Sequence, residues 1–335
     1  MTPFIAPYWL PVIFAGLMGL SILLYVIFDG YDLGVGILTA FEPTEDRDLM
    51  VASIGPFWDA NETWLVLGIG LLLVAFPMAH GIILTQLYLP VALMLVALIA
   101  RGVAFEFRAK AEPDWKPLWD RVFFGGSLLS ALTQGYMLGA YILGFDQSFL
   151  AVMFCLLAAI GLASGYVFVG ACWLIYKTEG KLQRQAVGWA RYGLWATAAS
   201  IGVVSLTTPM MSQRIFERWF HLPEIIALLP IPMMSAVLVL GLAIFLGRPE
   251  RKDDALSWVP LATAGTLFCL GFIGIAYSFY PYVVPDKLTI WQAASSPEAL
   301  SIILIGALFV LPVILGYSFL AHWIFRGKAT ALTYY

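Results

Sequence analysis

Nine stretches of about 20 or more predominantly apolar residues dominate this chain of 335 residues. A helix needs roughly 20 such residues to cross the hydrocarbon core of a membrane. With 61% hydrophobic and 12% charged residues, the chain carries more apolar surface than a soluble core of this size could bury. We therefore expect an all-α polytopic membrane protein with nine transmembrane helices, over residues 8–28, 54–76, 81–106, 119–143, 149–176, 187–207, 222–246, 258–280 and 300–325.

The basic residues predict the orientation of these helices. With the N-terminus outside, 15 of the 18 Lys and Arg residues fall on inner connections, and only Arg214, Arg218 and Lys287 fall on outer ones. Because cytoplasmic loops of membrane proteins are enriched in Lys and Arg, we expect a periplasmic N-terminus and a cytoplasmic C-terminus. One span more or fewer would mix the two sets, so the distribution also favours nine crossings.

The connections between stretches are short, which predicts antiparallel neighbours packed as bundles. We expect a single integral membrane domain over 1–335, with a first four-helix bundle at about 1–146 and a second at about 147–281. An outer segment and a ninth helix would complete it over 282–335. The first ten residues contain no Lys or Arg, so we expect the first span to be retained rather than removed as a signal peptide.

Four carboxylates interrupt the first two apolar stretches: Asp29 and Asp32 in FDGYDLGVG, and Asp59 and Glu62 in GPFWDANETW. A carboxylate at membrane depth is costly and by default marks a route for protons, ions or substrate. The members of each pair are three residues apart, so they share a helix face if the helix continues through them. With Arg101 at the inner end of the third span, the sequence predicts a carboxylate ladder that opens to the cytoplasm.

Two structural interpretations of these acids remain open. Asp29 and Asp32 could cap or finish the first helix, with Asp32 already at the membrane interface. Asp59 and Glu62 could pair with Arg101 and lock the bundle. The cost of charge inside a membrane favours a functional role for Asp59 and Glu62.

The chain offers little chemistry of its own. Its histidines, His80, His221 and His322, are not expected to face one another at mid-membrane as haem ligands would. The three cysteines lie within spans and lack CxxC spacing, which is typical of core residues. No nucleotide-binding, hydrolase or metalloprotease motif is present, and a net charge of −3 does not indicate nucleic acid. We expect no metal or cofactor bound by this chain, so a redox role would require a partner.

Several segments give the chain a resemblance to subunit II of cytochrome bd-type quinol oxidases, and the resemblance extends over nearly its whole length. WDANETW and TIWQAASSPE are the most specific motifs, and GIGLLLVAFPMAHG (68–81) is similar to the cyanide-insensitive branch of the family. The matching segments are FDGYDLGVGIL (28–38), GPFWDANETWLV (55–66), ALIARGVAFEFR (97–108), YPYVVPDKLTIWQAASSPEAL (280–300) and LPVILGYSFLAHWIFRGK (311–328).

The resemblance implies a complex of the bacterial inner membrane that oxidises quinol, reduces O2 to water and generates proton motive force. It implies haems b and d, or b only, in a partner subunit I, with this chain as the non-haem member of the heterodimer. Some relatives also hold small single-span subunits or a structural quinone. The resemblance implies that Asp59 belongs to a proton path from the cytoplasm; Trp58 and Glu62 match the same motif, and Asp29 matches the FDG position.

Two other functions fit the same residues. A proton-coupled secondary transporter could use the carboxylates, although such proteins often show inverted repeats and helices broken at mid-membrane, which this sequence lacks. Alternatively, the chain could be a purely structural subunit whose acids serve packing.

Overall fold

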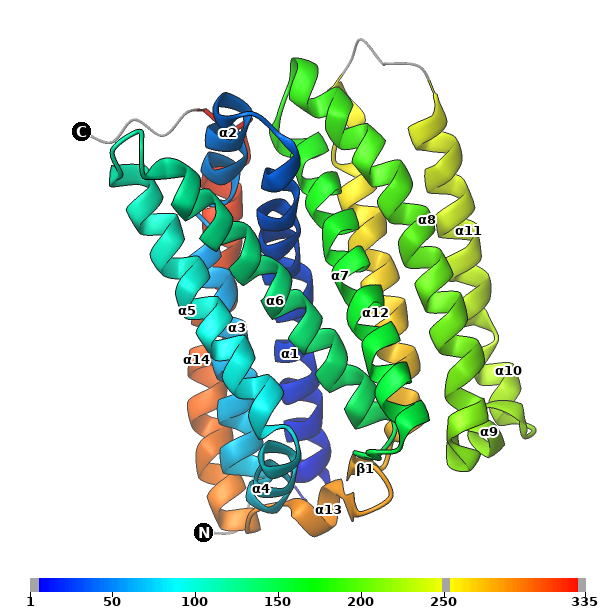
Figure 1. Ribbon diagram of the computed structural model, residues 1–335. Helices are drawn as coiled ribbons and strands as arrows, with labels where there is room; N and C mark the ends of the chain where they lie inside the picture. The colour runs from blue at the N-terminus through cyan, green and yellow to red at the C-terminus, as the bar shows by residue number, and fades with distance from the viewer. Residues whose placement is uncertain (1–5, 249–253, 331–335) are drawn as a thin grey trace.

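The computed structural model describes residues 6–248 and 254–330, and its elements are almost all helical (Figure 1). The α-helices are α1 (Trp9–Leu38), α2 (Thr44–Ile54), α3 (Trp58–Ala75), α4 (Pro77–Gln86), α5 (Tyr88–Lys110), α6 (Lys116–Ile142), α7 (Phe149–Lys177), α8 (Gly180–Met211), α9 (Gln213–Phe220), α10 (Glu224–Leu228), α11 (Pro230–Gly247), α12 (Val259–Phe279), α13 (Ile290–Ala293) and α14 (Pro297–Ile324). Short 3-10 turns, η1 (Thr39–Phe41) and η2 (Asp254–Leu256), and two strands, β1 (Tyr282–Val284) and β2 (Leu288–Thr289), complete the described chain.

Among the described residues, 8 helical segments are long and apolar enough to cross a membrane. They contain α1, α3, α5, α7, α8, α11, α12 and α14. The remaining expected span, 119–143, coincides with the 27-residue α6. This helix packs along α5 and α7 (Figure 1). Its first turns carry Lys116, Asp120 and Arg121, and its middle carries Thr133 and Gln134, so its composition is less apolar than that of its neighbours.

The structure divides two of the expected spans and lengthens another. Residues 54–76 belong to two helices, because α2 ends at Ile54 and α3 begins at Trp58. Pro56 lies in the break and has no backbone N–H to continue a helix. The stretch 81–106 is split at Leu87 between α4 and α5. The first helix, expected to end near Phe28, continues to Leu38.

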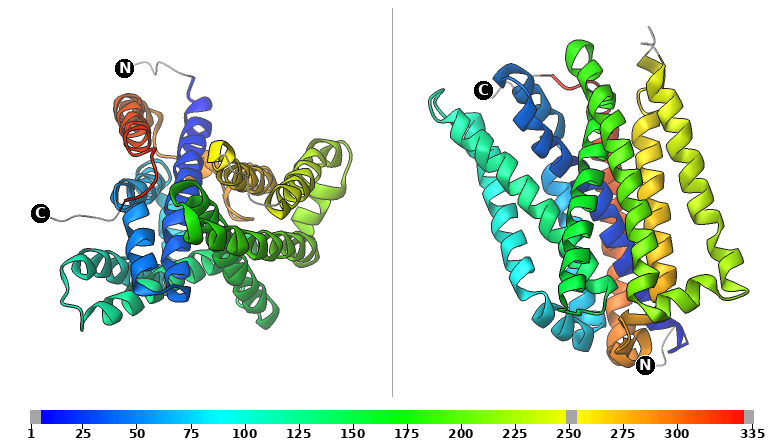
Figure 2. Two further views of the ribbon diagram at one scale, coloured as in Figure 1. Left: turned by 90° about the horizontal axis from the view of Figure 1, so that it is seen from above. Right: turned by 45° about the vertical axis from the view of Figure 1, so that its right-hand side comes forward.

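The first helix is central to the packing (Figures 1 and 2). α1 contacts α3 and α6 on one side and α7 and α12 on the other. Its closest approach to α7 is at Gly34 and Gly170, where a Cβ added to Gly170 would lie 2.6 Å from the carbonyl carbon of Gly34. Only glycine at both positions lets the two backbones meet, which places the polar residues of α1 deep inside the protein.

The connection between α12 and α14, expected as a segment on the outer surface, forms a small folded unit. β1 and β2 pair antiparallel and lead into α13 at the same end of the molecule as the start of α1 (Figure 1). Val283 and Val284 are buried, and the Tyr141 hydroxyl donates a hydrogen bond to the Val283 carbonyl oxygen at 2.7 Å. This hairpin is an addition to an otherwise helical fold.

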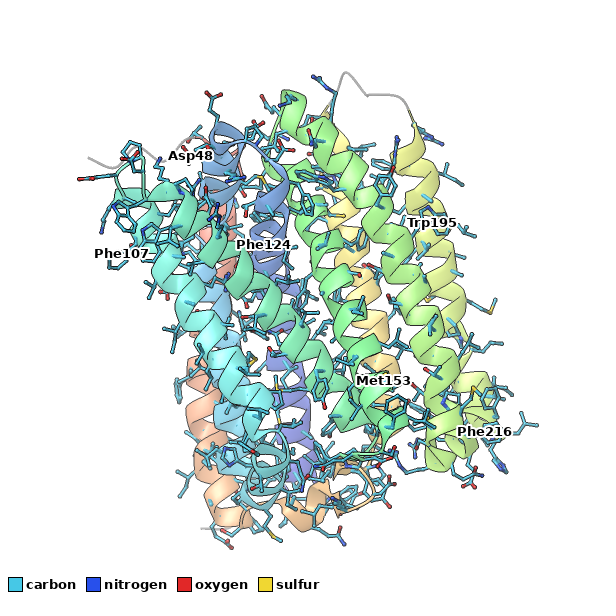
Figure 3. All side chains as sticks on the ribbon, viewed as in Figure 1. Asp48, Phe107, Phe124, Met153, Trp195 and Phe216 are labelled. Carbon is cyan, nitrogen blue, oxygen red and sulfur yellow. The ribbon has the colours of Figure 1, made fainter. Side chains whose placement is uncertain are left out.

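Much of the helical surface is apolar. Phe107 on α5, Met153 on α7, Trp195 on α8 and Phe216 on α9 are exposed and lie on the outside of the helices (Figure 3). A soluble protein rarely exposes apolar surface so widely, so this surface is suited to lipid or to another membrane protein.

Candidate functional site

Asp29 and Asp32 lie inside the protein, on a continuous stretch of α1. Both residues have 0% relative exposure, and the helix continues past them to Leu38. The structure therefore corrects the alternative in which these acids cap or finish the first helix. The physical reason is the glycine-rich sequence after Asp32, which allows α1 to continue against α7 rather than to stop at the membrane interface.

Arg101 supplies the positive charge for both acids. Its Nη1 atom lies 2.8 Å from Asp29 Oδ1, and its Nη2 atom lies 4.0 Å from Asp32 Oδ2. The arginine side chain is 2% exposed, so the three groups form a buried cluster of two carboxylates and one guanidinium. A buried ion group of this kind is held together because removal of one partner leaves an uncompensated charge away from water. We call Asp29, Asp32 and Arg101 the inner cluster.

Asn61 connects α3 to the inner cluster. Its Nδ2 atom donates to Asp32 Oδ2 at 2.8 Å and to the Tyr31 hydroxyl oxygen at 2.7 Å. Asn61 and Tyr31 are both buried, and the Tyr31 ring stacks on Trp173 of α7 with ring centroids 4.0 Å apart. Sequence reasoning missed both residues, although Tyr31 stands between the two aspartates and Asn61 stands within the WDANETW motif.

The other two predicted acids, Asp59 and Glu62, lie on a face of α3 different from that of Asn61. Asp59, in the first turn of the helix, is exposed, and Glu62 is partly buried. They continue at helical spacing into the exposed apolar residues Val66, Ile69 and Leu73. Glu62 remains within electrostatic reach of Asp29 and Arg101. We call Asp59 and Glu62 the outer pair.

The structure thus separates the predicted ladder into a buried part and a surface part. Within the described chain, both ion pairs of Arg101 go to α1, so the alternative in which Arg101 locks Asp59 and Glu62 is not what the fold contains. Trp58, which we expected from the motif to stand beside the acids, packs against α5, with its ring centroid 5.0 Å from that of Phe105.

A second ionic network ties the helix ends that lie beyond the inner cluster. Arg108 on α5 contacts Asp120 on α6 at 2.5 Å and Asp48 on α2 at 2.7 Å. Arg47 on α2 contacts the other oxygen of Asp120 at 2.9 Å. Asp48 is visible at this end of the molecule in Figure 3. These pairs tie α2 to α5 and α6.

Glu42 lies at the same end, just after η1. It is buried, and the pKa of its carboxyl is raised, first by burial and then by the nearby negative charge of Asp46. Unlike Asp29 and Asp32, it has no ion pair with a Lys or Arg among the described residues.

The histidines are far apart in the fold. His80 lies on α4, His221 follows α9, and His322 lies in the last turn of α14, where its Nε2 atom is 3.2 Å from the Tyr31 hydroxyl. Within residues 6–248 and 254–330, no group of three or more His, Cys, Asp or Glu residues is placed to hold a metal ion.

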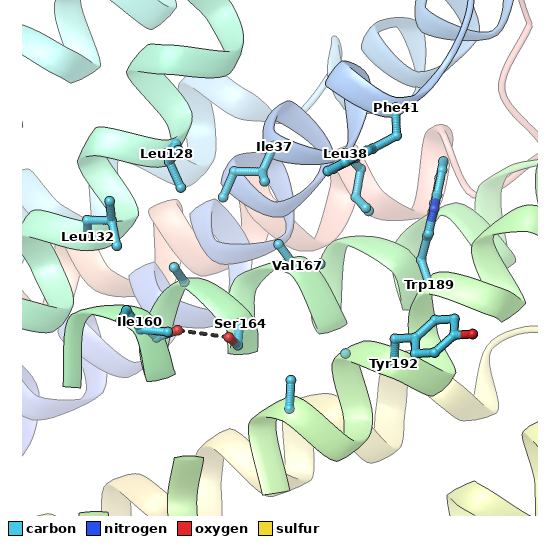
Figure 4. A pocket seen from close by; sticks show the side chains of 13 residues that line it. Ile37, Leu38, Phe41, Leu128, Leu132, Ile160, Ser164, Val167, Trp189 and Tyr192 are labelled. Atoms are coloured by element: carbon cyan, nitrogen blue, oxygen red, sulfur yellow. Dashed lines mark hydrogen bonds between the residues drawn. The ribbon is translucent and has the colours of Figure 1, made fainter. Parts of the chain in front are cut away.

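An apolar pocket of about 470 Å³ is lined by residues of α1, α6, α7 and α8 (Figure 4). Ile37 and Leu38 of α1, Leu128 of α6, Val167 of α7 and Trp189 of α8 contribute to its lining. The Ser164 hydroxyl donates to the Ile160 carbonyl at 2.8 Å, as drawn in Figure 4, and Tyr192 is the other hydroxyl-bearing residue of the lining. The pocket is suited to a hydrocarbon chain rather than to proton transfer.

Comparison with known proteins identifies a family that the chain matches. Residues 10–325 match the family model described as cytochrome bd terminal oxidase subunit II. The chain is 29% identical to cytochrome bd-I ubiquinol oxidase subunit 2 of Escherichia coli K12, over 94% of this chain and 93% of that protein. It is 28% identical to cytochrome bd ubiquinol oxidase subunit 2 of Bacillus subtilis, over 91% and 93%.

A solved structure shares the fold. The bd oxidase of Geobacillus thermodenitrificans superposes with a TM-score of 0.69 over 96% of this chain and 99% of the matched chain, at 10% sequence identity.

Proposed function

The chain belongs to the family of cytochrome bd terminal oxidase subunit II, and on that premise we propose that it supplies cytoplasmic protons to the oxygen-reducing site of a haem-bearing partner. The chain is a multi-pass protein of a bacterial inner membrane and a subunit of a cytochrome bd ubiquinol oxidase, an oxidoreductase complex. In the proposed reaction, the partner's haems oxidise quinol and reduce O2 to water, which consumes protons taken from the cytoplasm.

The proposed topology has nine crossings, with α6 as the crossing that its composition obscures. α6 is long enough, and it packs between α5 and α7 along its length. With the N-terminus periplasmic, the ion pairs of Arg47 and Arg108 lie on the cytoplasmic side, where basic residues are expected. The first bundle (1–146) and the second (147–281) would then meet at the α1–α7 contact, with residues 282–335 adding the hairpin and α14.

The observation that carries the proposal is the exposure of Asp59. A carboxylate on a helix face that continues into Val66 and Ile69 would meet lipid in the isolated subunit, at high cost. A partner that covers this face removes the carboxylate from lipid and places it at the boundary between the two subunits. Asp59 is then positioned to pass protons to groups of the partner.

The inner cluster is also suited to proton transfer. Glu62, the partly buried member of the outer pair, is within electrostatic reach of Asp29, Arg101 and Asp59. Two carboxylates that share one guanidinium carry a net charge of −1, and uptake of one proton makes the cluster neutral. We propose that Asp29 and Asp32 act with Glu62 and Asp59 as one cytoplasmic proton path.

The proposal also covers partners and ligands. The haem-bearing subunit I would cover α3 and the neighbouring surface of α5. The apolar pocket beside α1 is of a size and lining to take the hydrocarbon chain of a lipid or of a structural quinone. Small single-span subunits would find further apolar helix faces, such as that of Ile302, Phe309 and Val313 on α14.

The test is quinol-driven O2 consumption by the assembled oxidase, expressed per haem, in an Asp59→Asn variant. We expect a fall of about tenfold or more, as for the loss of a positioned proton-transfer group, with unchanged haem content. Asp114→Asn, which removes an exposed acid between α5 and α6, is the matched control and should retain the wild-type rate. An unaltered rate in Asp59→Asn refutes the proton role, and equal losses of haem and activity would instead indicate a structural subunit.

A further inference from the structure

His322 on α14 is joined to the inner cluster by a chain of hydrogen bonds. Its Nε2 atom lies 3.2 Å from the Tyr31 hydroxyl oxygen, which accepts from Asn61 Nδ2 at 2.7 Å. The same amide nitrogen donates to Asp32 Oδ2 at 2.8 Å. Residues from three helices, α14, α1 and α3, therefore connect the last turn of α14 to a buried acid.

The direction of each hydrogen bond follows from its partners. The Nδ1 atom of His322 lies 2.8 Å from the Ser318 carbonyl oxygen, which can only accept, so Nδ1 carries the proton of the neutral ring. Nε2 is then an acceptor, and the Tyr31 hydroxyl donates to it. In this state the Tyr31 proton is held by His322.

The surroundings of His322 keep this geometry fixed. Phe57, Phe28 and Trp173 enclose the ring at centroid distances of 4.7, 5.3 and 6.2 Å. Lys177 of α7 lies behind two of these rings, with Nζ 5.4 Å from the Phe57 centroid and 5.5 Å from the Trp173 ring. The charged groups that act on His322 are therefore Lys177 from α7 and, through Asn61 and Tyr31, Asp32 from α1.

We propose that His322 is a positioning residue that couples cytoplasmic protonation to Asp32 through Tyr31. The inference rests on the proposed proton path. When the His322 ring gains a proton, both of its nitrogens become donors, so the bond to Tyr31 reverses. The Tyr31 hydroxyl then accepts from Nε2 as well as from Asn61 Nδ2, and its own proton is no longer held by His322. No covalent bond to carbon changes, and the change at the ring reaches Asp32 through Tyr31 and Asn61.

Two variants of the complete oxidase test the coupling. Tyr31→Phe removes the hydroxyl and keeps the ring that stacks on Trp173. His322→Gln keeps hydrogen-bonding atoms in place of the ring and cannot titrate. We expect each to lower O2 turnover per haem about fivefold, the value of roughly one hydrogen bond. Both should abolish the same ionisation in the pH profile of turnover, and the double variant should be no slower than the slower single variant.

Controls separate this coupling from packing and from the proton path itself. Tyr141→Phe removes another buried hydroxyl, at the hairpin end, and should keep the wild-type pH profile. If either His322→Gln or Tyr31→Phe assembles with full haem content and keeps the wild-type profile, the coupling is overturned. Two single effects that add in the double variant would overturn it too. Asp59→Asn is measured beside them: a slow Asp59→Asn with an unchanged Tyr31→Phe contradicts only the coupling, whereas wild-type rates in both contradict the proton path as well.

Discussion

The inner cluster and the outer pair occupy neighbouring places on one side of the protein, yet their surroundings are opposite. Asp29 and Asp32 are fully buried. Arg101 forms ion pairs with both carboxylates, and Asn61 donates a hydrogen bond to Asp32. Asp59 lies less than a turn of α3 away from Asn61, but it is exposed and continues into an apolar helix face. Among the residues that the structure describes, Asp29 and Asp32 have hydrogen-bonding and ionic partners, whereas Asp59 and Glu62 have none.

This difference in surroundings indicates which acids matter for the fold of the subunit and which matter for its contact with the partner. A buried carboxylate without a partner would destabilise the fold, so the partners of Asp29 and Asp32 had to be built into the same chain. An exposed carboxylate in a membrane face is costly only until another protein covers it. In the proposed account, the inner cluster therefore contributes to folding as well as to proton transfer, whereas the outer pair acts after assembly.

The largest effect is expected from the loss of the inner guanidinium. Arg101→Gln leaves two buried carboxylates without a positive partner, which costs about 3–5 kcal/mol of folding free energy. We expect little assembled, haem-containing oxidase to be recovered from membranes. Arg121→Gln, at an exposed site on α6, is the matched control and should assemble normally. Equal recovery of the two variants would break the distinction between the two acid groups.

A smaller effect is expected at the connection between α3 and the cluster. Asn61→Leu has a similar volume but leaves Asp32 Oδ2 without its amide donor, at a cost of about 1–3 kcal/mol. Thermal unfolding of the purified complex should show the loss. Thr63→Val is a suitable control, since its hydroxyl is donated only to the Ala60 carbonyl of its own helix. An Asn61→Leu complex as stable as the control would show that Arg101 alone holds Asp32.

The smallest effect is expected at Glu42, a buried acid that forms no ion pair within residues 6–248 and 254–330. Burial, followed by the charge of Asp46, raises the pKa of Glu42 in the folded protein. The folded state therefore holds the proton more tightly than the unfolded chain, and stability falls as the pH rises through this raised pKa. Glu42→Gln should raise the melting temperature by about 1–2 °C at pH 7.

The sign of the Glu42 effect sharpens the comparison. Near pH 4 the wild-type carboxyl is protonated in both states, so the two proteins should melt at the same temperature. Melting curves at the two pH values check this directly. A Glu42→Gln variant that is less stable than the wild type at pH 7 would mean that Glu42, like the inner acids, has a partner for its charge.

The sequence was sufficient for the helical fold, because long apolar stretches have few other structures available. It was also sufficient to single out the acids, since charge is conspicuous in such stretches. It could not show that α1 continues past Asp32, because this depends on the contact of Gly34 with Gly170 on a distant helix. A window of residues around FDGYD contains no information about α7.

The sequence also could not show which face of α3 points toward the interior. Asp59 and Asn61 are two residues apart, which places them on opposite sides of a helix. Only the positions of α1 and α5 decide which of the two faces inward, and the structure selects Asn61. The polar residue most easily overlooked in the motif is therefore the one that contacts Asp32, and the prominent acid lies outside.

The central claim, that the outer pair carries protons to the partner, is tested most directly by proton uptake. The reduced, reconstituted oxidase would be mixed with O2 in the presence of a pH-sensitive dye, comparing wild type with Asp59→Asn at equal haem content. The account predicts that proton uptake in Asp59→Asn becomes slower by about tenfold or more, while the initial binding of O2 keeps its wild-type rate. Proton uptake at the wild-type rate in a fully assembled Asp59→Asn complex would contradict it.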